Sequence, residues 1–342
     1  MAKPIPLWPG EFVSLGTDGD VFVRTASPAQ PGNGEGEPVL CVHGFGGSST
    51  NWTDLMHLLS GAYVPDRPLP GLDLNPLFSC DAIDLPGFGY SPPAHDSSYS
   101  VSGQAATLAA LIERRGRGPV HLLGNSLGGA VCTRLAATRP DLVKSLTLIA
   151  PAMPDLRPRP TPARFPALCV PKVGGWLLSR AQRLPSRTRV ELSIGTIYFD
   201  GSCVHPDRIA ADIAEVERRD GLGYSEAVLL RCARSIVAEY LRRGTGSLWR
   251  DAANVTAPTL VIYGSHDRLV DPRMAGRAAR AFRGGRVVVL PRTGHVAQME
   301  RPAAVAAEIR RLLISPPLAH DGFWGEPAAA RDGNEPMARP VV

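Results

Sequence analysis

Ser126 lies in a sequence setting that can turn a serine into a nucleophile. Residues 120–129 read VHLLGNSLGG, so an apolar, strand-like run enters Gly-x-Ser-x-Gly, and a helical stretch follows to about residue 138. In a nucleophile elbow, this sharp turn lifts the serine hydroxyl clear of both strand and helix. Gly124 and Gly128 suit the turn because they lack a Cβ that would collide with neighbouring backbone. The pattern predicts a reactive Ser126 beside the positive end of a helix dipole.

A serine hydroxyl needs a base that takes its proton, and a histidine does this best when a carboxylate orients it. His295 and Asp267 each come directly after a predicted strand, in PRTGH after residues 287–290 and in GSHDR after residues 260–263. Catalytic groups gather at the carboxyl ends of parallel strands. We therefore predict that Ser126, Asp267 and His295 meet at one edge of a sheet.

Other histidines and carboxylates compete for these roles. His266 adjoins the candidate acid but should face away from it on the loop. The alternative acids are Asp271, four residues after Asp267, and Asp155, which follows the predicted strand at residues 145–149. His43 is interpreted as a brace for a glycine-rich loop, and Asp84 as a residue that shapes its own loop.

The order of the predicted elements indicates an α/β fold. After a short antiparallel hairpin, strands alternate with helical segments of about ten to fifteen residues, which is typical of parallel βαβ units with helices on both faces of a sheet. The predicted strands cover residues 12–15, 21–24, 39–42, 78–83, 120–123, 145–149, 259–263 and 286–290. The predicted helices outside the central insertion cover residues 52–59, 101–115, 127–138, 272–282 and 302–314.

A helical insertion is predicted between the two halves of this core. Residues 11–150 and 251–315 carry the strand pattern, whereas residues 151–250 are first proline-rich and then helical, with no clear strand. Residues 65–76 form a second, proline-rich insertion, and residues 316–342 are interpreted as a mobile C-terminal tail. The apolar side chains of the helical insertion are expected in its own core more than on a pocket wall; they include Phe165, Leu168, Trp176, Leu177, Leu178, Ile197, Tyr198 and Phe199.

Composition and charge exclude several classes of function. The net charge of +5 comes from 37 basic and 32 acidic residues, and no basic block is long enough to indicate nucleic-acid binding. The six cysteines lie 29 or more residues apart, which predicts neither a metal site nor a redox pair. No segment has the length of a membrane span or a signal sequence, so we expect no stable membrane insertion and a cytoplasmic location. The oligomeric state stays open.

Five glycine-containing segments follow one another in an informative order. They are HGFGG at 43–47, DLPGFGYS at 84–91, GNSLGG at 124–129, GSHD at 264–267 and GHVAQME at 294–300. Together they resemble the α/β-hydrolase superfamily, in which the nucleophile, acid and histidine also follow in this order. The resemblance spans about residues 11–314 and implies an α/β-hydrolase fold: a mostly parallel central sheet flanked by helices, with an inserted helical cap.

The resemblance assigns roles to individual residues. Ser126 would be the nucleophile, His295 the general base and then the general acid, and Asp267 the carboxylate that orients it. The oxyanion hole would consist of the backbone N–H of Leu127 and of Phe45, with neighbouring Gly46 as the alternative donor. Each such donor stabilises the transition state by about 3 kcal/mol. No metal and no cofactor are expected.

The nucleophile separates the branches of this superfamily. Haloalkane dehalogenases and epoxide hydrolases attack with an aspartate, so Ser126 disfavours both. Residues 124–129, the Asn51-Trp52 pair and residues 294–300 are similar to serine-dependent carbon–carbon bond hydrolases of ring-fission products. Those enzymes usually carry an aromatic residue after the histidine and Gly-Pro-Gly in the oxyanion loop, whereas this chain has Val296 and an FGG sequence. Carboxylesterases fit at least as well.

The leading hypothesis is a cofactor-independent serine hydrolase that cleaves a carboxylic ester or thioester of a hydrophobic small molecule through an acyl-enzyme. Carbon–carbon bond hydrolysis is the first alternative, and a non-catalytic member that binds a ligand or a partner protein is the second. The helical cap would set the choice of substrate through a hydrophobic pocket. Arg218 and Arg219 of this cap are interpreted as a solvated helix face, with substrate carboxylate binding as the alternative.

Overall fold

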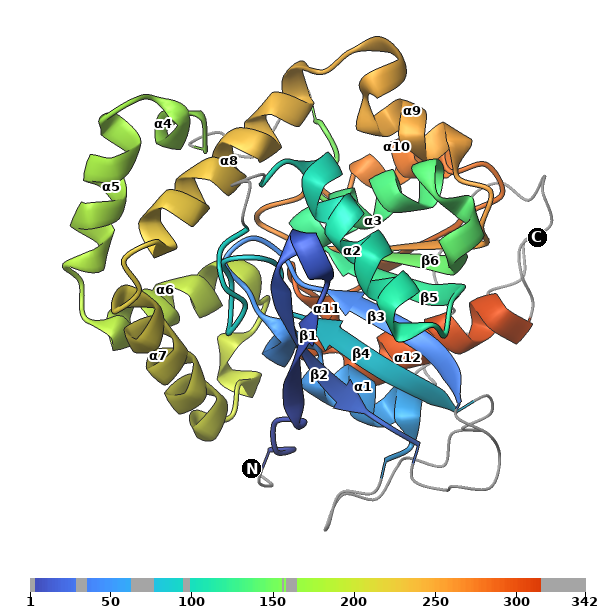
Figure 1. The fold of residues 1–342 in the computed structure, drawn as a ribbon, viewed down its shortest axis with the longest axis horizontal. Helices are drawn as coiled ribbons and strands as arrows, with labels where there is room; N and C mark the ends of the chain where they lie inside the picture. Colours follow the sequence, from blue (N-terminus) through green and yellow to red (C-terminus); the bar gives the residue numbers. More distant parts are fainter. Residues whose placement is uncertain are drawn as a thin grey trace, which may run out of the picture.

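An eight-stranded sheet forms the centre of the protein (Figure 1). The computed structural model describes residues 4–28, 36–62, 77–94, 99–155, 157 and 165–314. The strand order is β1-β2-β4-β3-β5-β6-β7-β8. The β1–β2 and β2–β4 pairs are antiparallel, and all pairs from β4 to β8 are parallel. The strands are β1 (Gly10–Ser14), β2 (Asp20–Ala26), β3 (Glu37–Val42), β4 (Phe78–Ile83), β5 (Val120–Asn125), β6 (Val143–Ile149), β7 (Thr259–Gly264) and β8 (Arg286–Leu290).

The central strands are apolar on both faces because helices cover both faces. In β3, Val39 and Cys41 pack into one hydrophobic cluster, while Leu40 and Val42 pack into the cluster on the opposite face. This alternation follows from the two-residue period of a strand. Continuous apolar runs such as residues 39–42 are therefore buried strands, as the sequence predicts.

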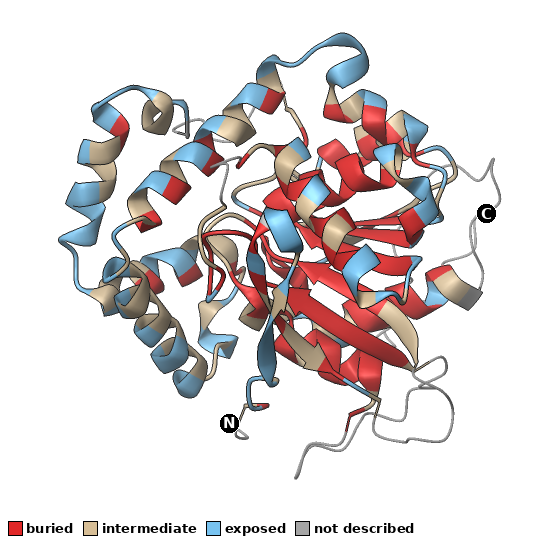
Figure 2. Cartoon of the chain, viewed as in Figure 1, coloured by how far each residue is buried: buried red, intermediate tan, exposed pale blue. Residues whose placement is uncertain are grey.

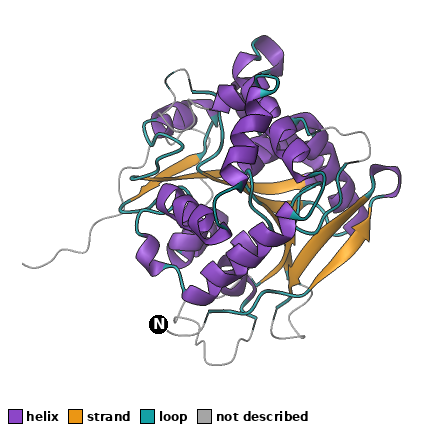
Figure 3. Cartoon of the chain, turned by 90° about the vertical axis from the view of Figure 1, so that its left-hand side faces the viewer, coloured by secondary structure: helices purple, strands orange, loops and turns teal. Residues whose placement is uncertain are grey.

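Two groups of helices cover the sheet, one on each side (Figure 3). Every helix predicted outside the insertion is present, with ends displaced by at most two residues. One face carries α1 (Thr53–Ser60), α11 (Ala297–Glu300) and α12 (Pro302–Ile314). The other carries α2 (Val101–Arg115), α3 (Leu127–Thr138), α9 (Leu248–Asn254) and α10 (Met274–Ala281). Short 3-10 helices lie at Gly16–Asp18, Ser49–Trp52, Pro140–Leu142, Gly201–Cys203 and Gly244–Gly246.

Five further helices, here named the helical insertion, come between β6 and β7 in the sequence. They lie to one side of the sheet (Figure 1). They are α4 (Phe165–Cys169), α5 (Val173–Gln182), α6 (Ser186–Ile197), α7 (Pro206–Asp220) and α8 (Ser225–Leu241). The part of residues 151–250 that the structure describes contains no strand, as predicted, although the exact limits of the insertion stay a prediction.

The insertion has only a small core of its own. Val190, Ile194 and Tyr198 pack together with Val296, which belongs to the loop after β8 that carries His295, here named the histidine loop. The expectation of a buried Trp176 is wrong, because 61% of its surface is exposed. In Figure 2, α5 is largely exposed while the central strands are buried. The predicted insertion at 65–76 and the predicted tail at 316–342 lie outside the described residues.

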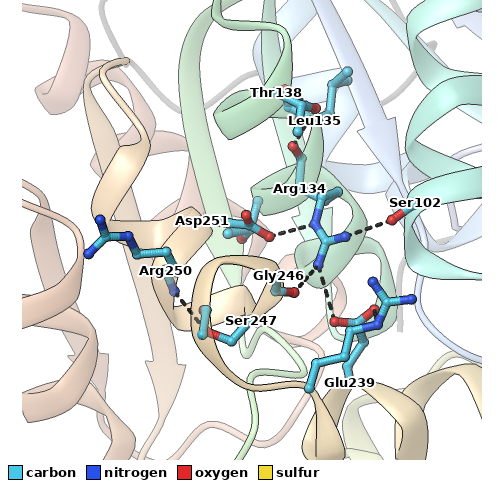
Figure 4. A network of polar contacts seen from close by, with 12 residues as sticks. Ser102, Arg134, Leu135, Thr138, Glu239, Gly246, Ser247, Arg250 and Asp251 are labelled. Carbon is cyan, nitrogen blue, oxygen red and sulfur yellow. Dashed lines mark hydrogen bonds and ion pairs between the residues drawn. The ribbon is translucent and has the colours of Figure 1, made fainter.

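A buried arginine of α3, the helix that follows Ser126, joins the helical insertion to the core (Figure 4). Arg134 of α3 donates to Asp251 Oδ2 of α9 at 2.5 Å and to Glu239 Oε2 of α8 at 3.2 Å. It also donates to the Ser102 hydroxyl at 2.6 Å and to the Gly246 carbonyl oxygen at 3.1 Å. Burial raises the pKa of both carboxyl groups, and the Arg134 charge opposes that change.

Replacing Arg134 should destabilise the fold strongly. Arg134→Met removes the ion-pair partner of buried Asp251 and leaves buried Glu239 with only the half-exposed Arg242, at 3.4 Å, and breaking a buried pair in this way costs about 3–5 kcal/mol. We expect a clearly lower melting temperature in thermal unfolding, followed by circular dichroism. The triple variant Arg134→Met, Glu239→Gln, Asp251→Asn should recover part of the loss, since no buried charge is then left unpaired.

Arg139→Gln is the matched control. Arg139 also binds two carboxylates, Asp141 and Glu113, but this cluster lies at the surface, where water screens it. Its replacement should change the melting temperature little. Equal losses in Arg134→Met and Arg139→Gln would show that the buried network does not hold the insertion to the core.

Candidate active site

Ser126 stands at the turn between β5 and α3 with an unusual backbone conformation. Its φ is 53° and its ψ is −116°, in a region that non-glycine residues rarely adopt. The Ser126 N–H donates to the Ile149 carbonyl oxygen at 3.0 Å, which ties the turn to the end of β6. A Cβ on Gly128 would lie 2.3 Å from the Val42 carbonyl oxygen, so only glycine lets α3 approach β3 this closely.

Asp267 and His295 form a buried pair. His295 Nδ1 lies 2.8 Å from Asp267 Oδ2, and the aspartate side chain is fully buried. Asp267 Oδ1 accepts from the N–H groups of Leu269 at 2.7 Å and Val270 at 3.0 Å. A carboxylate held in this way accepts the Nδ1 proton, so the neutral imidazole keeps Nε2 as its basic atom.

Backbone bonds fix the histidine loop from two sides. The His295 N–H donates to the Ile197 carbonyl oxygen at the end of α6, at 2.7 Å. The Asn125 side chain donates to the carbonyl oxygens of His295 at 3.1 Å and Ile149 at 3.0 Å. Glu300 accepts from the Gly294 N–H at 2.7 Å. Asn125 and Glu300 lie in the predicted motifs, but their roles could not be predicted because their partners are backbone atoms of other segments.

The 43–47 loop lies directly over the serine. A Cβ on Gly44 would lie 3.0 Å from Ser126 Cβ, so a side chain there would force the loop and the serine a few tenths of an ångström apart. Phe45 follows at the cavity surface, and Gly46 has a φ of +74°. Leu127 is the first residue of α3, and the N–H groups of a first helical turn have no acceptor within their own helix.

His43 braces this loop, as predicted. Its ring is buried, with Nδ1 2.7 Å from the Gly44 carbonyl oxygen, while Nε2 accepts from the Leu85 N–H at 3.0 Å. Burial lowers the pKa of His43, so the ring stays neutral. Because both ring nitrogens are occupied, His43 is not available as a base.

Asp84 also has the structural role that the sequence predicts. Its carboxylate accepts from the Ser49 N–H at 2.6 Å and from the Tyr90 N–H at 2.9 Å. It thereby joins the segment after the 43–47 loop to its own loop at 84–91. The bond to Ser49 is buried, and the bond to Tyr90 is partly buried.

The competing candidates lie apart from the buried pair. His266 is exposed, and its Nδ1 lies 2.8 Å from the Ser265 hydroxyl. Asp155 and Asp271 both form ion pairs with Arg273, at 3.0 and 3.6 Å. Among the described residues, no three His, Cys, Asp or Glu side chains are placed to hold a metal ion.

A cavity of about 550 Å³ lies between the core and the helical insertion, and Ser126, His295 and Phe45 all contribute to its wall. Much of the lining is apolar and comes from the insertion and the histidine loop; it includes Val190, Ile194, Ile197, Val216, Ile236 and Val296. Ile197 and Tyr198 therefore line the cavity as well as packing in the insertion. A site of this size and character suits a hydrophobic small molecule.

Two adjacent arginines at the end of α7 hold the loops of the core. Arg219 lines the cavity and donates to the Gly46 carbonyl oxygen at 3.3 Å, and burial lowers its pKa. Arg218 donates to the Gly89 carbonyl oxygen and lies 4.5 Å from the centre of the Tyr90 ring. The interpretation of these residues as a solvated helix face is therefore wrong.

Comparison with known proteins supports the same family. The model of the alpha/beta hydrolase fold family matches residues 37–302. Lipase 1 of Psychrobacter immobilis is 25% identical over 274 residues, covering 80% of this chain and 75% of the lipase. The pimeloyl-[acyl-carrier protein] methyl ester esterase of Neisseria meningitidis is 28% identical over 273 residues, covering 80% of this chain and 75% of the esterase.

A solved structure shows the same fold at lower identity. The 2-hydroxy-6-oxo-6-phenylhexa-2,4-dienoate hydrolase of Rhodococcus superposes with a TM-score of 0.66 and 20% identity, covering 91% of this chain and all of that one. The family match covers well over half of the chain, and the sheet order and flanking helices agree with it. The chain therefore belongs to the α/β-hydrolase fold family.

Proposed function

We propose that this protein is a cofactor-independent serine hydrolase that cleaves a carboxylic ester or thioester of a hydrophobic small molecule. One observation carries the proposal: Ser126 of the elbow and His295, which is bonded to buried Asp267, line the same largely apolar cavity. A binding protein has no need for a strained serine beside an oriented histidine. The lipase and methyl ester esterase relatives support ester chemistry.

The geometry performs this reaction in two stages. His295 Nε2 takes the proton of Ser126 Oγ as the oxygen attacks the carbonyl carbon, and the Asp267 carboxylate stabilises the imidazolium. The N–H groups of Leu127 and Phe45 hold the oxyanion. His295 then protonates the leaving alcohol or thiol, and an acyl-enzyme remains. Water, activated by the same histidine, releases the acid and restores Ser126.

A fluorophosphonate probe tests the nucleophile. The wild type should be labelled and should hydrolyse p-nitrophenyl esters, with medium-length acyl chains preferred over acetyl because the cavity is apolar. Ser126→Ala should lose the label and roughly 10⁶-fold in kcat, as expected when a nucleophile is removed. Ser193→Ala is the matched control, since Ser193 lines the same cavity but follows no strand turn.

The outcomes separate the candidate functions. A wild type that is neither labelled nor active supports the non-catalytic alternative. Labelling at Ser126 with turnover of a dienoic ring-fission product, but of no ester, supports carbon–carbon bond hydrolysis. Labelling that survives in Ser126→Ala contradicts the assignment of the nucleophile.

Arg219 should affect turnover more than substrate binding. Its bond to the Gly46 carbonyl oxygen fixes the loop that carries the Phe45 N–H, so Arg219→Met should lower kcat about tenfold, less than the loss of an oxyanion donor itself. Arg219→Lys should restore part of kcat. The control is Arg208→Met. Arg208 lies on the same helix as Arg219, and its replacement removes an ion pair with Asp54 of α1. Equal effects of Met and Lys, confined to KM, would contradict this role.

Four residues with polar groups, Asn51, Tyr198, Asp212 and Glu215, line both the cavity at Ser126 and a second cavity of about 840 Å³. Burial raises the pKa of Asp212 to about 6, although Arg208 opposes this shift. The wall between the two cavities therefore contains a carboxyl group that is partly protonated near pH 6.

Asp212 should make stability depend on pH. A carboxyl whose folded-state pKa is raised contributes stability below its unfolded pKa of about 4, and this contribution is lost as the pH rises through 6. Asp212→Asn should therefore become more stable relative to the wild type between pH 4 and 7 and show no further change above that range. Melting temperatures measured across pH test this. A difference between Asp212→Asn and the wild type that stays constant across this pH range would contradict the prediction.

A further inference from the structure

Helix α5 presents an apolar face that no other described element covers. Trp176 is 61% exposed, Val173 42%, and Val170 and Leu184 at the two flanks are 47% and 43% exposed. The opposite side of the helix does pack: Gly174 is buried, with the α4 backbone and Leu230 of α8 next to it. Since residues three or four apart share a helix face, the exposed side chains lie on one outward side.

The same surface is basic. Residues 169–184 contain three basic residues, Lys172, Arg180 and Arg183, and no aspartate or glutamate, whereas Arg187 and Arg189 further along form ion pairs with Glu191 and Asp220. Lys172, Arg180 and Arg183 are exposed beside the apolar side chains, and the Arg180 guanidinium lies 5.9 Å from the centre of the Trp176 ring. We name this surface the α5 patch: Val170, Lys172, Val173, Trp176, Arg180, Arg183 and Leu184.

We propose that the α5 patch docks the protein onto the surface of an anionic lipid bilayer. Aliphatic side chains and a tryptophan flanked by cations are the features of a helix that lies at the headgroup boundary. Each basic side chain near an anionic leaflet adds favourable electrostatic energy. Residues 169–184 contain no acidic residue that would oppose it, although Glu226 of α8 lies against Gly175 of α5. The attachment is peripheral, since no helix among the described residues is long and apolar enough to cross a bilayer.

The dimensions favour a lipid surface over an acidic protein. The ten residues of α5 extend about 15 Å, so its outward side is small beside the roughly 800 Å² that each partner buries in a standard protein interface. A shallow insertion into lipid needs only a few apolar side chains and nearby cations. An acidic protein partner is therefore the competing outcome in the test.

The patch adjoins the wall of the catalytic cavity. α4 contacts both α5 and α8, and its Pro166 lines the cavity together with Leu241 of α8, which is 75% exposed. Docking would bring this part of the wall close to the bilayer, where hydrophobic esters dissolve. Only this link to substrate supply rests on the proposed function; docking itself does not.

Vesicle flotation of the full-length Ser126→Ala protein tests docking apart from catalysis. We expect binding to vesicles of equal parts phosphatidylglycerol and phosphatidylcholine, weakened by salt, and little binding to phosphatidylcholine alone. Neutralising Lys172, Arg180 and Arg183 to glutamine should weaken binding roughly 100-fold, and Trp176→Ser should weaken it further. The control neutralises three exposed arginines outside the patch, Arg250, Arg280 and Arg283, and should change binding only slightly.

Three results would overturn the proposal. The first is that the parent protein does not bind the anionic vesicles. The second is that the triple variant of the patch and the triple control variant lose equal amounts of vesicle binding. The third is equally tight, patch-dependent binding to soluble polyglutamate, which indicates an acidic protein partner. Circular dichroism, and hydrolysis of a soluble p-nitrophenyl ester by the variants with Ser126 restored, check that each variant is folded. Flotation without any esterase activity would support docking and contradict only the proposed function.

Discussion

The backbone conformation of Ser126 is the constraint on which the rest of the site depends. A non-glycine residue at φ 53° and ψ −116° costs of order 1–3 kcal/mol and persists only where its surroundings hold it. Here the Ser126 N–H is bonded to β6, and its carbonyl oxygen accepts from Ala130 at 3.2 Å and Ala152 at 2.9 Å. The bond to Ala130 continues α3, while the bond to Ala152 holds the chain that leads into the helical insertion. The strain is therefore offset on both sides of the turn.

The helical insertion is part of the site as well as its cover. The Ile197 carbonyl oxygen holds the His295 backbone, and Arg219 holds the 43–47 loop at Gly46. Glu300, five residues after His295, accepts from the Phe199 N–H at 3.1 Å and so ties the loop after α6 to the core. A shift of α6 or α7 would move His295 and the 43–47 loop directly, because hydrogen bonds connect them. In the proposed reaction, the helices that line the cavity would therefore also position the reacting groups.

The sequence predicted the elements and the principal residues because their signals are local. Apolar runs at residues 39–42 and 260–263 mark buried strands, and Asp267 and His295 stand directly after strands, so a parallel sheet must bring them to one edge. The roles of Asn125, Ile197 and Glu300 were not predicted, since these residues act through hydrogen bonds to or from backbone atoms as far as 170 residues away. Trp176 was placed wrongly because periodicity locates the apolar side of a helix but does not say whether another element covers it.

The placement of arginines separates two physical roles within the insertion and its contacts. Arg134 and Arg219 lie between the insertion and the core, where carboxylates or carbonyl oxygens occupy their guanidinium groups. A buried cation requires such partners, because desolvation is costly. Lys172, Arg180 and Arg183 are exposed instead, beside exposed apolar side chains. Exposed charges contribute little to folding, so their grouping around an apolar helix face is the basis of the proposed docking surface.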